Sequence, residues 1–226
     1  MSKKYYILGV VAVPAVILCC VFFGGDMITS DELDREILNS PTQNETPEKP
    51  ATEILMLVNA THKIPDDFTP TLTTEGVIYN VIMSDDVEEM RQAAMEEGIY
   101  LVFNDAYRNQ EQQQWLYDTL GSRLAQKPGY SEHETGLAID FSFNQLSSYD
   151  QTQMWNWLKN NSYKYGFILR YPAGKESITG IDYEAWHYRY VGKDAAKIIY
   201  ENDWVLEEYL EKNQAAYAPD SFGSSG

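Results

Sequence analysis

Two short stretches of the sequence carry residue types that can bind a metal ion and activate water. The segment Ser131–Asp140 (SEHETGLAID) contains His133 and Asp140, and the segment Glu184–His187 (EAWH) adds a glutamate and a second histidine. Two imidazoles and one carboxylate can hold a zinc ion and leave one coordination position open for water. The glutamate three residues before His187 supplies the base that such a water needs. Because the chain has only three histidines and this pattern uses two, we interpret it as a zinc hydrolase site.

The spacing of these residues also resembles that of a known family. Ser-x-His-x-x-Gly-x-x-x-Asp, followed downstream by Glu-x-Trp-His, is similar to the zinc D,D-carboxypeptidases that trim cell-wall peptides, above all those of the VanY type found in glycopeptide-resistance systems. Three further segments resemble the same family: Leu57–Pro65, Tyr107–Tyr117 and Lys164–Pro172. The resemblance therefore extends from about Ile54 to Leu210.

The resemblance implies a role for each residue of the site. The implied zinc ligands are His133, Asp140 and His187. Glu184 would act as the general base toward water and later as the acid that protonates the departing amine. Arg108 would hold the substrate carboxylate in a bidentate pair, or stabilise the oxyanion on the scissile carbonyl. Two further residues match substrate-contact positions of the family, Gln113 and Ser131.

Several of these residues also have a purely structural reading. Arg108 could form a surface salt bridge, and Glu184 could be a solvated loop residue. Arg170 could be a second cation of the site or one member of a structural ion pair. His62 has no partner at a ligand-like spacing, so we interpret it as structural. Trp186 is interpreted as a core residue rather than a platform for substrate.

The function implied by the resemblance is removal of the C-terminal D-Ala from peptidoglycan pentapeptide precursors. This reaction would destroy the terminus that vancomycin binds, which links the activity to glycopeptide resistance. Three alternatives stay open: an L,D-carboxypeptidase acting on tetrapeptides, a crosslink-cutting endopeptidase, and a zinc-bearing module that binds wall peptides without cleaving them. Imidazole and carboxylate ligands also suit other transition metals. The preference for D-Ala or D-lactate and the oligomeric state stay open as well.

Two predicted strands explain how distant residues could share one ion. In Leu137–Phe143 the bulky residues alternate, so Asp140 lies on the opposite face with small neighbours. In Trp186–Tyr190 the aromatic residues alternate in the same way, and His187 shares the other face with Arg189. Glu184 is an odd number of residues from His187, so the chain must bend near Ala185 if Glu184 serves the same site.

Helical patterns surround these strands. A helix from Ser84 to Gly98 and one over Asp150–Asn160 have clear apolar faces, formed by Val87, Met90 and Ala94 in the first and by Met154, Trp157 and Leu158 in the second. A helix over Asn109–Leu124 is expected to bury Trp115, Leu116 and Leu120. The remaining predicted elements are a strand at Ile99–Phe103 and helices at Lys193–Glu201 and Trp204–Lys212. This mixture predicts an α+β domain, with helices packed around a small, mainly antiparallel sheet that carries the zinc site.

The N-terminus predicts attachment to a membrane. Lys3 and Lys4 precede an apolar run over Tyr5–Phe23, which is just long enough for a transmembrane helix. Flanking lysines keep this end in the cytoplasm and place the rest of the chain outside, as a single-pass protein of the cell membrane. A cleaved signal peptide and a lipoprotein signal are the alternatives. The expected organisation is an anchor over 1–25, a polar linker over 26–53, the peptidase domain over 54–212 and a disordered tail over 213–226.

The cysteine positions and the net charge exclude some kinds of metal ligand and some binding partners. Both cysteines, Cys19 and Cys20, lie in the apolar run, so the exported domain would have neither a disulfide nor a thiolate zinc ligand. The net charge is −17, with no clustered basic stripe, which excludes nucleic acid as a partner. The expected partners are the membrane and peptidoglycan stem peptides that end in D-Ala.

Overall fold

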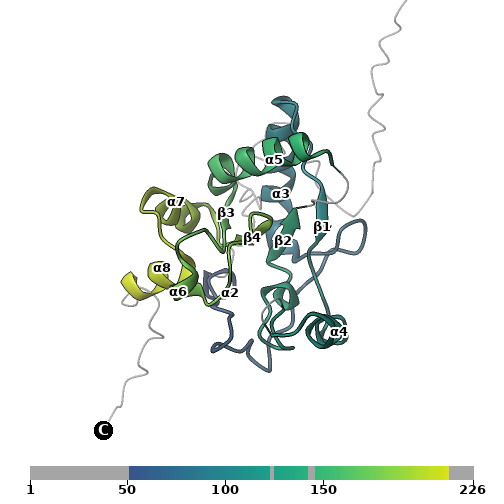
Figure 1. The fold of residues 1–226 in the computed structure, drawn as a ribbon, viewed down its shortest axis with the longest axis vertical. Coiled ribbons are helices and arrows are strands. Elements are labelled where there is room, and N and C mark those ends of the chain that lie inside the picture. Colours follow the sequence, from purple (N-terminus) through teal and green to yellow (C-terminus); the bar gives the residue numbers. More distant parts are fainter. Residues whose placement is uncertain (1–50, 123–124, 142–145, 214–226) are drawn as a thin grey trace, which may run out of the picture. The chain divides into compact units, whose positions relative to one another are not determined.

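The computed structural model describes residues 51–122, 125–141 and 146–213 (Figure 1). The predicted anchor, most of the linker and nearly all of the tail lie outside these residues. Within the described residues, no helix combines the length and the apolar character that crossing a membrane requires.

A four-stranded sheet lies at the centre of the domain. Its strands are β1 (Phe103–Asp105), β2 (Ala138–Phe141), β3 (Phe167–Leu169) and β4 (His187–Tyr190), in the order β1-β2-β4-β3. Every neighbouring pair is antiparallel, which confirms the predicted sheet. One wall of the core is formed by large side chains of the strands, together with Leu137 just before β2. These residues are almost fully buried: Leu137, Ile139, Phe141, Phe167, Tyr188 and Tyr190.

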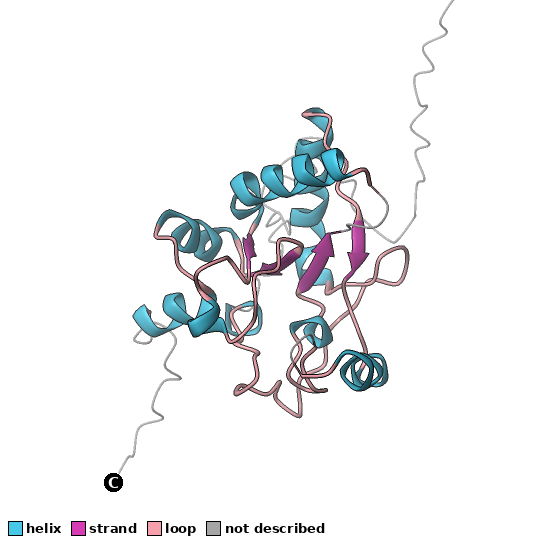
Figure 2. Cartoon of the chain, viewed as in Figure 1, coloured by secondary structure: helices cyan, strands magenta, loops and turns pink. Residues whose placement is uncertain are grey.

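Helices surround the sheet (Figure 2). They are α2 (Ala51–Ile54), α3 (Ser84–Glu96), α4 (Gln110–Leu120), α5 (Ser148–Asn161), α6 (Glu176–Thr179), α7 (Lys193–Glu201) and α8 (Leu206–Lys212). Three short 3-10 turns complete the described elements: η1 (Val81–Met83), η2 (Glu132–Thr135) and η3 (Ser162–Tyr165). The predicted apolar faces of α3 and α5 are confirmed, because all six of their named residues are buried.

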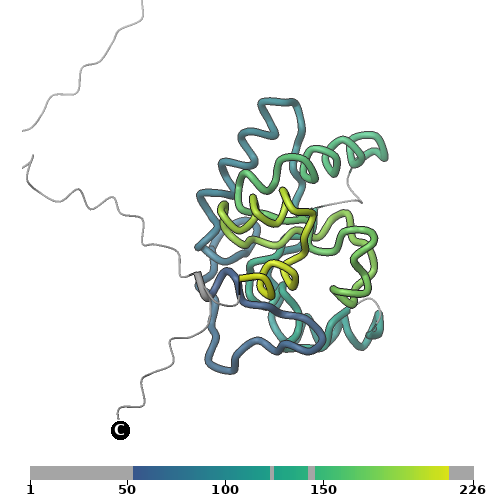
Figure 3. The backbone as a smooth tube through the Cα atoms, turned by 90° about the vertical axis from the view of Figure 1, so that its left-hand side faces the viewer, coloured from purple at the N-terminus to yellow at the C-terminus, as the bar shows by residue number. Residues whose placement is uncertain are grey.

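The two ends of the described domain meet. Asn59 Nδ2 donates a hydrogen bond of 3.3 Å to Glu207 Oε1 of α8. Figure 3 shows the helices near the C-terminal end, in yellow, beside the first described segment, in blue. Arg189 of β4 also donates to the carbonyls of Ile54 and Met56. The segment that follows α2 is thereby fastened to the sheet.

Three local predictions were wrong. The strand predicted over Ile99–Phe103 begins only at Phe103, because the Ile99 N–H donates to the Ala94 carbonyl and so closes α3 instead of pairing in the sheet. Helix α4 ends at Leu120, where Gly121 adopts a positive φ of 77°, rather than at Leu124. Its expected buried side is also wrong, since Trp115 and Leu120 are 65% and 46% exposed.

Candidate metal centre and pocket

Pairing of β2 with β4 brings Asp140 and His187 together. The two residues are direct partners in the antiparallel register, so their side chains project from the same face of the sheet. His187 Nδ1 lies 2.9 Å from Asp140 Oδ1. Their chain neighbours Ile139 and Tyr188 are also partners and face the core. The alternation expected from the sequence is therefore present in both strands.

His133 reaches the same point from η2, the turn before β2. Gly136 ends this turn with a φ of 69°, and a Cβ there would lie only 2.8 Å from the Asn80 backbone nitrogen. The position, in the turn between the first two ligand candidates, therefore requires glycine. The Nδ1–H of His133 donates to the Ala106 carbonyl at 2.5 Å, so Nε2 is the nitrogen that faces Asp140, 3.3 Å from its Oδ1.

The three side chains fit the requirements of a zinc ion. Their potential ligand atoms all lie within 4.8 Å of one another, and all three residues are buried. Burial alone would lower the pKa of His187, but its contacts with Asp140 and Glu132 raise that pKa to about 9. The carboxylates of Asp140 and Glu132 thus stabilise a positive charge at His187. A backbone carbonyl behind one imidazole is also a usual support for a histidine ligand.

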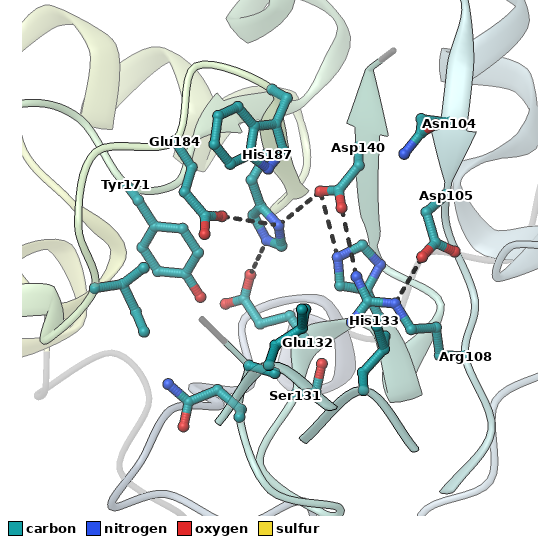
Figure 4. Close-up of a pocket in the computed structure, with 16 residues that line it drawn as sticks. Asn104, Asp105, Arg108, Ser131, Glu132, His133, Asp140, Tyr171, Glu184 and His187 are labelled. Carbon is teal, nitrogen blue, oxygen red and sulfur yellow. Dashed lines mark hydrogen bonds and ion pairs between the residues drawn. The ribbon is translucent and has the colours of Figure 1, made fainter. Parts of the chain in front are cut away.

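Glu184 faces the same centre from the loop before β4. The chain bends between it and the strand, where the His187 N–H approaches the Glu184 carbonyl at 3.4 Å. As a result, Glu184 Oε2 lies 3.8 Å from His187 Nδ1 (Figure 4). Burial raises the pKa of this carboxyl, which helps it to retain a proton once it has accepted one. The bend expected near Ala185 is therefore found.

Arg108 lies on the other side of Asp140 (Figure 4). Its Nε donates to Asp105 Oδ2 at 2.7 Å, its Nη1 to Gln113 Oε1 at 2.8 Å and its Nη2 to Asp140 Oδ2 at 3.4 Å. The interpretation as an exposed surface ion pair does not hold, because the side chain is only 14% exposed. Among the described residues that line the pocket, it is the only arginine or lysine.

Gln113 and Ser131, the two predicted substrate contacts, differ in position. Gln113 is fully buried behind Arg108, donates to the Gln126 carbonyl and does not line the pocket. Its contacts make it a support for the guanidinium. Ser131 lines the pocket, and its hydroxyl does not cap the turn that it begins.

A pocket of about 400 Å³ opens over these groups. Its apolar walls include Leu116 and Leu120 of α4, Ile181 and Trp186. Trp186 was predicted to be a core residue. It is instead only partly buried and forms part of the pocket wall.

Tyr171 also lines the pocket, and the sequence had not singled it out. The residue is 6% exposed, its ring lies 4.8 Å from that of His187, and its hydroxyl has no hydrogen-bond partner among the described residues. Burial keeps its pKa well above 10, so the hydroxyl is a neutral donor.

Glu132 is a second residue that the sequence reasoning missed. It is buried, and its Oε2 lies 3.2 Å from His187 Nε2. Its Oε1 accepts from Arg170 Nε at 2.7 Å and lies 3.1 Å from Arg189 Nη1. Burial would raise its pKa, but the two arginines hold it far below the usual range. A signal was present, because Arg170 directly after β3 and Arg189 within β4 stand among apolar residues, and a buried arginine needs a carboxylate partner.

Two other residues have structural contacts. Arg170 is fully buried, forms ion pairs with Glu132 and Glu207, and does not line the pocket, so it is the structural pair rather than a second substrate cation. His62 is exposed, contacts Asn59 and Thr61 within its own turn, and also lies outside the pocket lining.

Two buried imidazoles and a carboxylate, with a glutamate beside them in a pocket, define the site of a zinc hydrolase. Residues 79–193 match the model of the VanY family of D-alanyl-D-alanine carboxypeptidases, and the chain belongs to this family.

Two curated relatives agree with this assignment. The chain is 40% identical over 187 residues to a putative carboxypeptidase, YodJ, of Bacillus subtilis, a match that covers 70% of this chain and 67% of the relative. It is 34% identical over 196 residues to a D-alanyl-D-alanine carboxypeptidase of Enterococcus faecium, over 76% of this chain and 64% of the relative. The chain thus spans about two thirds of the length of these relatives.

Solved structures share the fold. The VanY D,D-pentapeptidase of a VanB-type cassette, as a glutamate-to-alanine mutant in complex with Zn(II), has a TM-score of 0.65 and 34% identity, over 70% of this chain and 99% of that one. VanYB in complex with D-alanine-D-alanine has a TM-score of 0.65 and 35% identity, over 70% and 97%. The L,D-carboxypeptidase LdcB has a TM-score of 0.64 and 36% identity, over 71% and 87%.

Proposed function

We propose that this protein is a zinc D,D-carboxypeptidase that removes the C-terminal D-Ala from peptidoglycan pentapeptide precursors. The observation that carries the proposal is the meeting of His133, Asp140 and His187 in a pocket that also holds Glu184. Family membership and the similarity to a VanYB complex with D-alanine-D-alanine support this choice of substrate. Loss of the terminal residue would remove the vancomycin-binding terminus, so the activity would contribute to glycopeptide resistance.

The residues divide the chemistry among them. Zinc, when held by the two imidazoles and Asp140, supplies a Lewis acid that polarises the scissile carbonyl and lowers the pKa of water. Glu184 takes a proton from the attacking water as the new C–O bond forms, and returns it to the amine nitrogen as the C–N bond breaks. Its buried position, which raises its pKa, favours the first step, in which Glu184 takes up the proton.

Arg108 supplies the positive charge that the peptide needs. Hydrogen bonds from its guanidinium to Asp105 and Gln113 fix its orientation before substrate arrives. The remaining N–H groups can bind the free carboxylate or the oxyanion of the scissile carbonyl. Ser131 lies within the same lining and can donate to the peptide backbone.

The direct test is release of D-alanine from a synthetic pentapeptide. Activity is expected to disappear after treatment with a chelator, because removal of the metal leaves the site without a Lewis acid. It is expected to return when zinc is added. Mass spectrometry of the products of pentapeptide and tetrapeptide separates the proposal from its main rival. Cleavage of the tetrapeptide alone would show an L,D-carboxypeptidase, an alternative that the similarity to LdcB keeps in view. Zinc and peptide binding without any cleavage would instead show a binding module.

Tyr171 is expected to contribute to turnover through its hydroxyl. Replacing it by phenylalanine removes one donor and keeps the ring, so kcat/KM should fall by about 10- to 100-fold if the hydroxyl binds a charged or developing oxygen of the peptide. Tyr183→Phe is the matched control, because Tyr183 is 48% exposed and does not line the pocket. Equal activity of Tyr171→Phe and wild type in the D-alanine assay would contradict this role.

The apolar run before the domain supports a location outside the cytoplasmic membrane. A retained anchor would keep the enzyme near newly exported precursors, and the polar linker would give it reach. Fractionation of cells with an antibody to the domain tests this: the full-length protein is expected in the membrane fraction, accessible to protease added outside the cell. Release of a shortened protein into the medium would indicate a cleaved signal peptide.

A further inference from the structure

A chain of buried charged side chains leads from the metal centre to helix α8. Glu132 Oε2 lies 3.2 Å from His187 Nε2, and Glu132 Oε1 accepts from Arg170 Nε at 2.7 Å. The other edge of the Arg170 guanidinium donates two hydrogen bonds, of 2.8 Å and 2.6 Å, to the carboxylate of Glu207 in α8. A carboxylate near the C-terminal end of the domain is therefore two side chains away from a metal-binding histidine.

Each link in this chain fixes the orientation of the next. The contact of Glu132 with Nε2 leaves Nδ1 of His187 to face Asp140 and the ion, and so selects which nitrogen binds. Glu132 is placed by Arg170, whose planar guanidinium is held by a two-point pair with Glu207. A bidentate pair defines a direction as well as a distance, which a single hydrogen bond does not.

The charges of the chain balance. Glu132 and Glu207 carry two negative charges, and Arg170 and Arg189 carry two positive charges, so the four side chains are neutral together. Both arginines are fully buried, and Glu132 is 2% exposed. A charged group that is removed from water is stable only when groups of opposite charge contact it, so the loss of one partner is costly. Loss of the Glu207 charge would leave an excess positive charge behind His187, where it opposes a divalent cation.

We propose that Glu207 is a positioning residue for the metal centre, acting through Arg170 and Glu132 on His187. The proposal rests on the zinc site proposed above. Helix α8 lies beyond residues 79–193, the part of the chain that matches the family model. The C-terminal helix is thus part of the support of the metal site, and not merely a cover of the core.

The neighbouring residue of the same helix offers a matched control. Glu208 is also ion-paired, with Lys175 at 2.9 Å, and accepts from the Val205 N–H at the start of α8. Replacing it disturbs the docking and the cap of the helix without touching the charge chain. Glu207→Gln and Glu208→Gln therefore separate a specific effect on the metal from a general loosening of α8.

The experiment measures the zinc dissociation constant of the full chain by competition with a chelator, together with thermal unfolding of the metal-free protein. Loss of a residue that directly supports a ligand, such as Glu132, costs about 10- to 100-fold in metal affinity. Because Glu207 acts through two further side chains, Glu207→Gln is expected to weaken zinc binding by about 10-fold, the lower end of that range. Glu208→Gln should stay within about twofold of wild type, as expected for a partly exposed pair. Equal weakening in both variants, or wild-type affinity in Glu207→Gln, would overturn the proposal.

A double-mutant cycle tests the route. If Glu207 acts through Glu132, the effects of Glu207→Gln and Glu132→Gln on zinc affinity will not add, whereas independent effects will add and refute the route. Glu207→Asp keeps the charge and should lose less affinity than Glu207→Gln. Should Glu207→Gln fail to fold, Glu207→Asp carries the test, because its shorter side chain cannot keep the two-point pair with Arg170. Its zinc affinity should then be measurably below that of wild type, and an unchanged affinity counts against the proposal. A wild-type protein that binds no zinc would instead refute the zinc site itself.

Discussion

Replacing Glu184 by glutamine is expected to abolish most D-alanine release while zinc stays bound. The substitution keeps the shape of the side chain and removes its ability to accept a proton, and a positioned acid–base group contributes about 10²- to 10⁴-fold to the rate. None of the three ligand residues depends on Glu184 for its main contact. The zinc content of the variant, measured by metal analysis, should therefore equal that of wild type, and kcat should fall with little change in KM.

Two comparisons make this prediction specific. Glu96→Gln, which alters an exposed glutamate of α3, should leave the activity unchanged. His133→Ala should lose both zinc and activity, because it removes a ligand rather than a base. Substantial turnover by Glu184→Gln would mean that another group moves the proton, and the mechanism above would have to be abandoned.

Replacing Arg189 by methionine is expected to be strongly destabilising. Arg189 is fully buried, lies 3.1 Å from Glu132 and donates to the carbonyls of Ile54, Met56 and Tyr190. Removing one partner of a buried ion pair costs about 3–5 kcal/mol. Without Arg189, Arg170 alone would face the carboxylates of Glu132 and Glu207, so one negative charge would stay buried in excess. The free energy of unfolding in urea, measured without metal, should fall by this amount.

Arg91→Met is the control for the loss of an arginine as such. Arg91 pairs with Glu88 on the surface of α3, where both side chains are 52% exposed. An exposed pair of this kind contributes about 0–1 kcal/mol. If the two variants had the same stability, the buried charges around Glu132 would not hold the domain together.

The metal centre could be located from the sequence because its signals are local. Alternation within Leu137–Phe141 and within Trp186–Tyr190 assigns Asp140 and His187 to the side of each strand that faces away from the core. Their pairing in the sheet then follows from the fold. The apolar faces of α3 and α5 follow from helical periodicity in the same way.

Helix α4 shows where periodicity misleads. Its apolar residues were expected to face the core, yet Leu116 and Leu120 line the pocket, and Gln113 is the buried one. Apolar residues at helical spacing therefore do not by themselves show that a helix face packs on the core. In α4, two of the three line the pocket, and Trp115 is exposed.

Glu132 could not be assigned because its partners are distant in the sequence. It lies beside His133, but its contacts are with Arg170 and Arg189, 38 and 57 residues further along, and with a nitrogen of His187. No pattern within a short stretch of sequence predicts contacts between residues so far apart. Only the three-dimensional arrangement distinguishes Glu132 from the many solvated acidic residues of this chain.

The direct pairing of Asp140 with His187 has a consequence for how the protein tolerates change. Successive side chains in a strand point to opposite faces, so a slip of one residue in either strand would turn its ligand toward the core and bring its neighbour, Ile139 or Tyr188, to the metal. A deletion or insertion of a single residue within β2 or β4 would therefore dismantle the centre, even with every ligand type still present. The number of residues in these two strands is constrained more tightly than the identity of most of them.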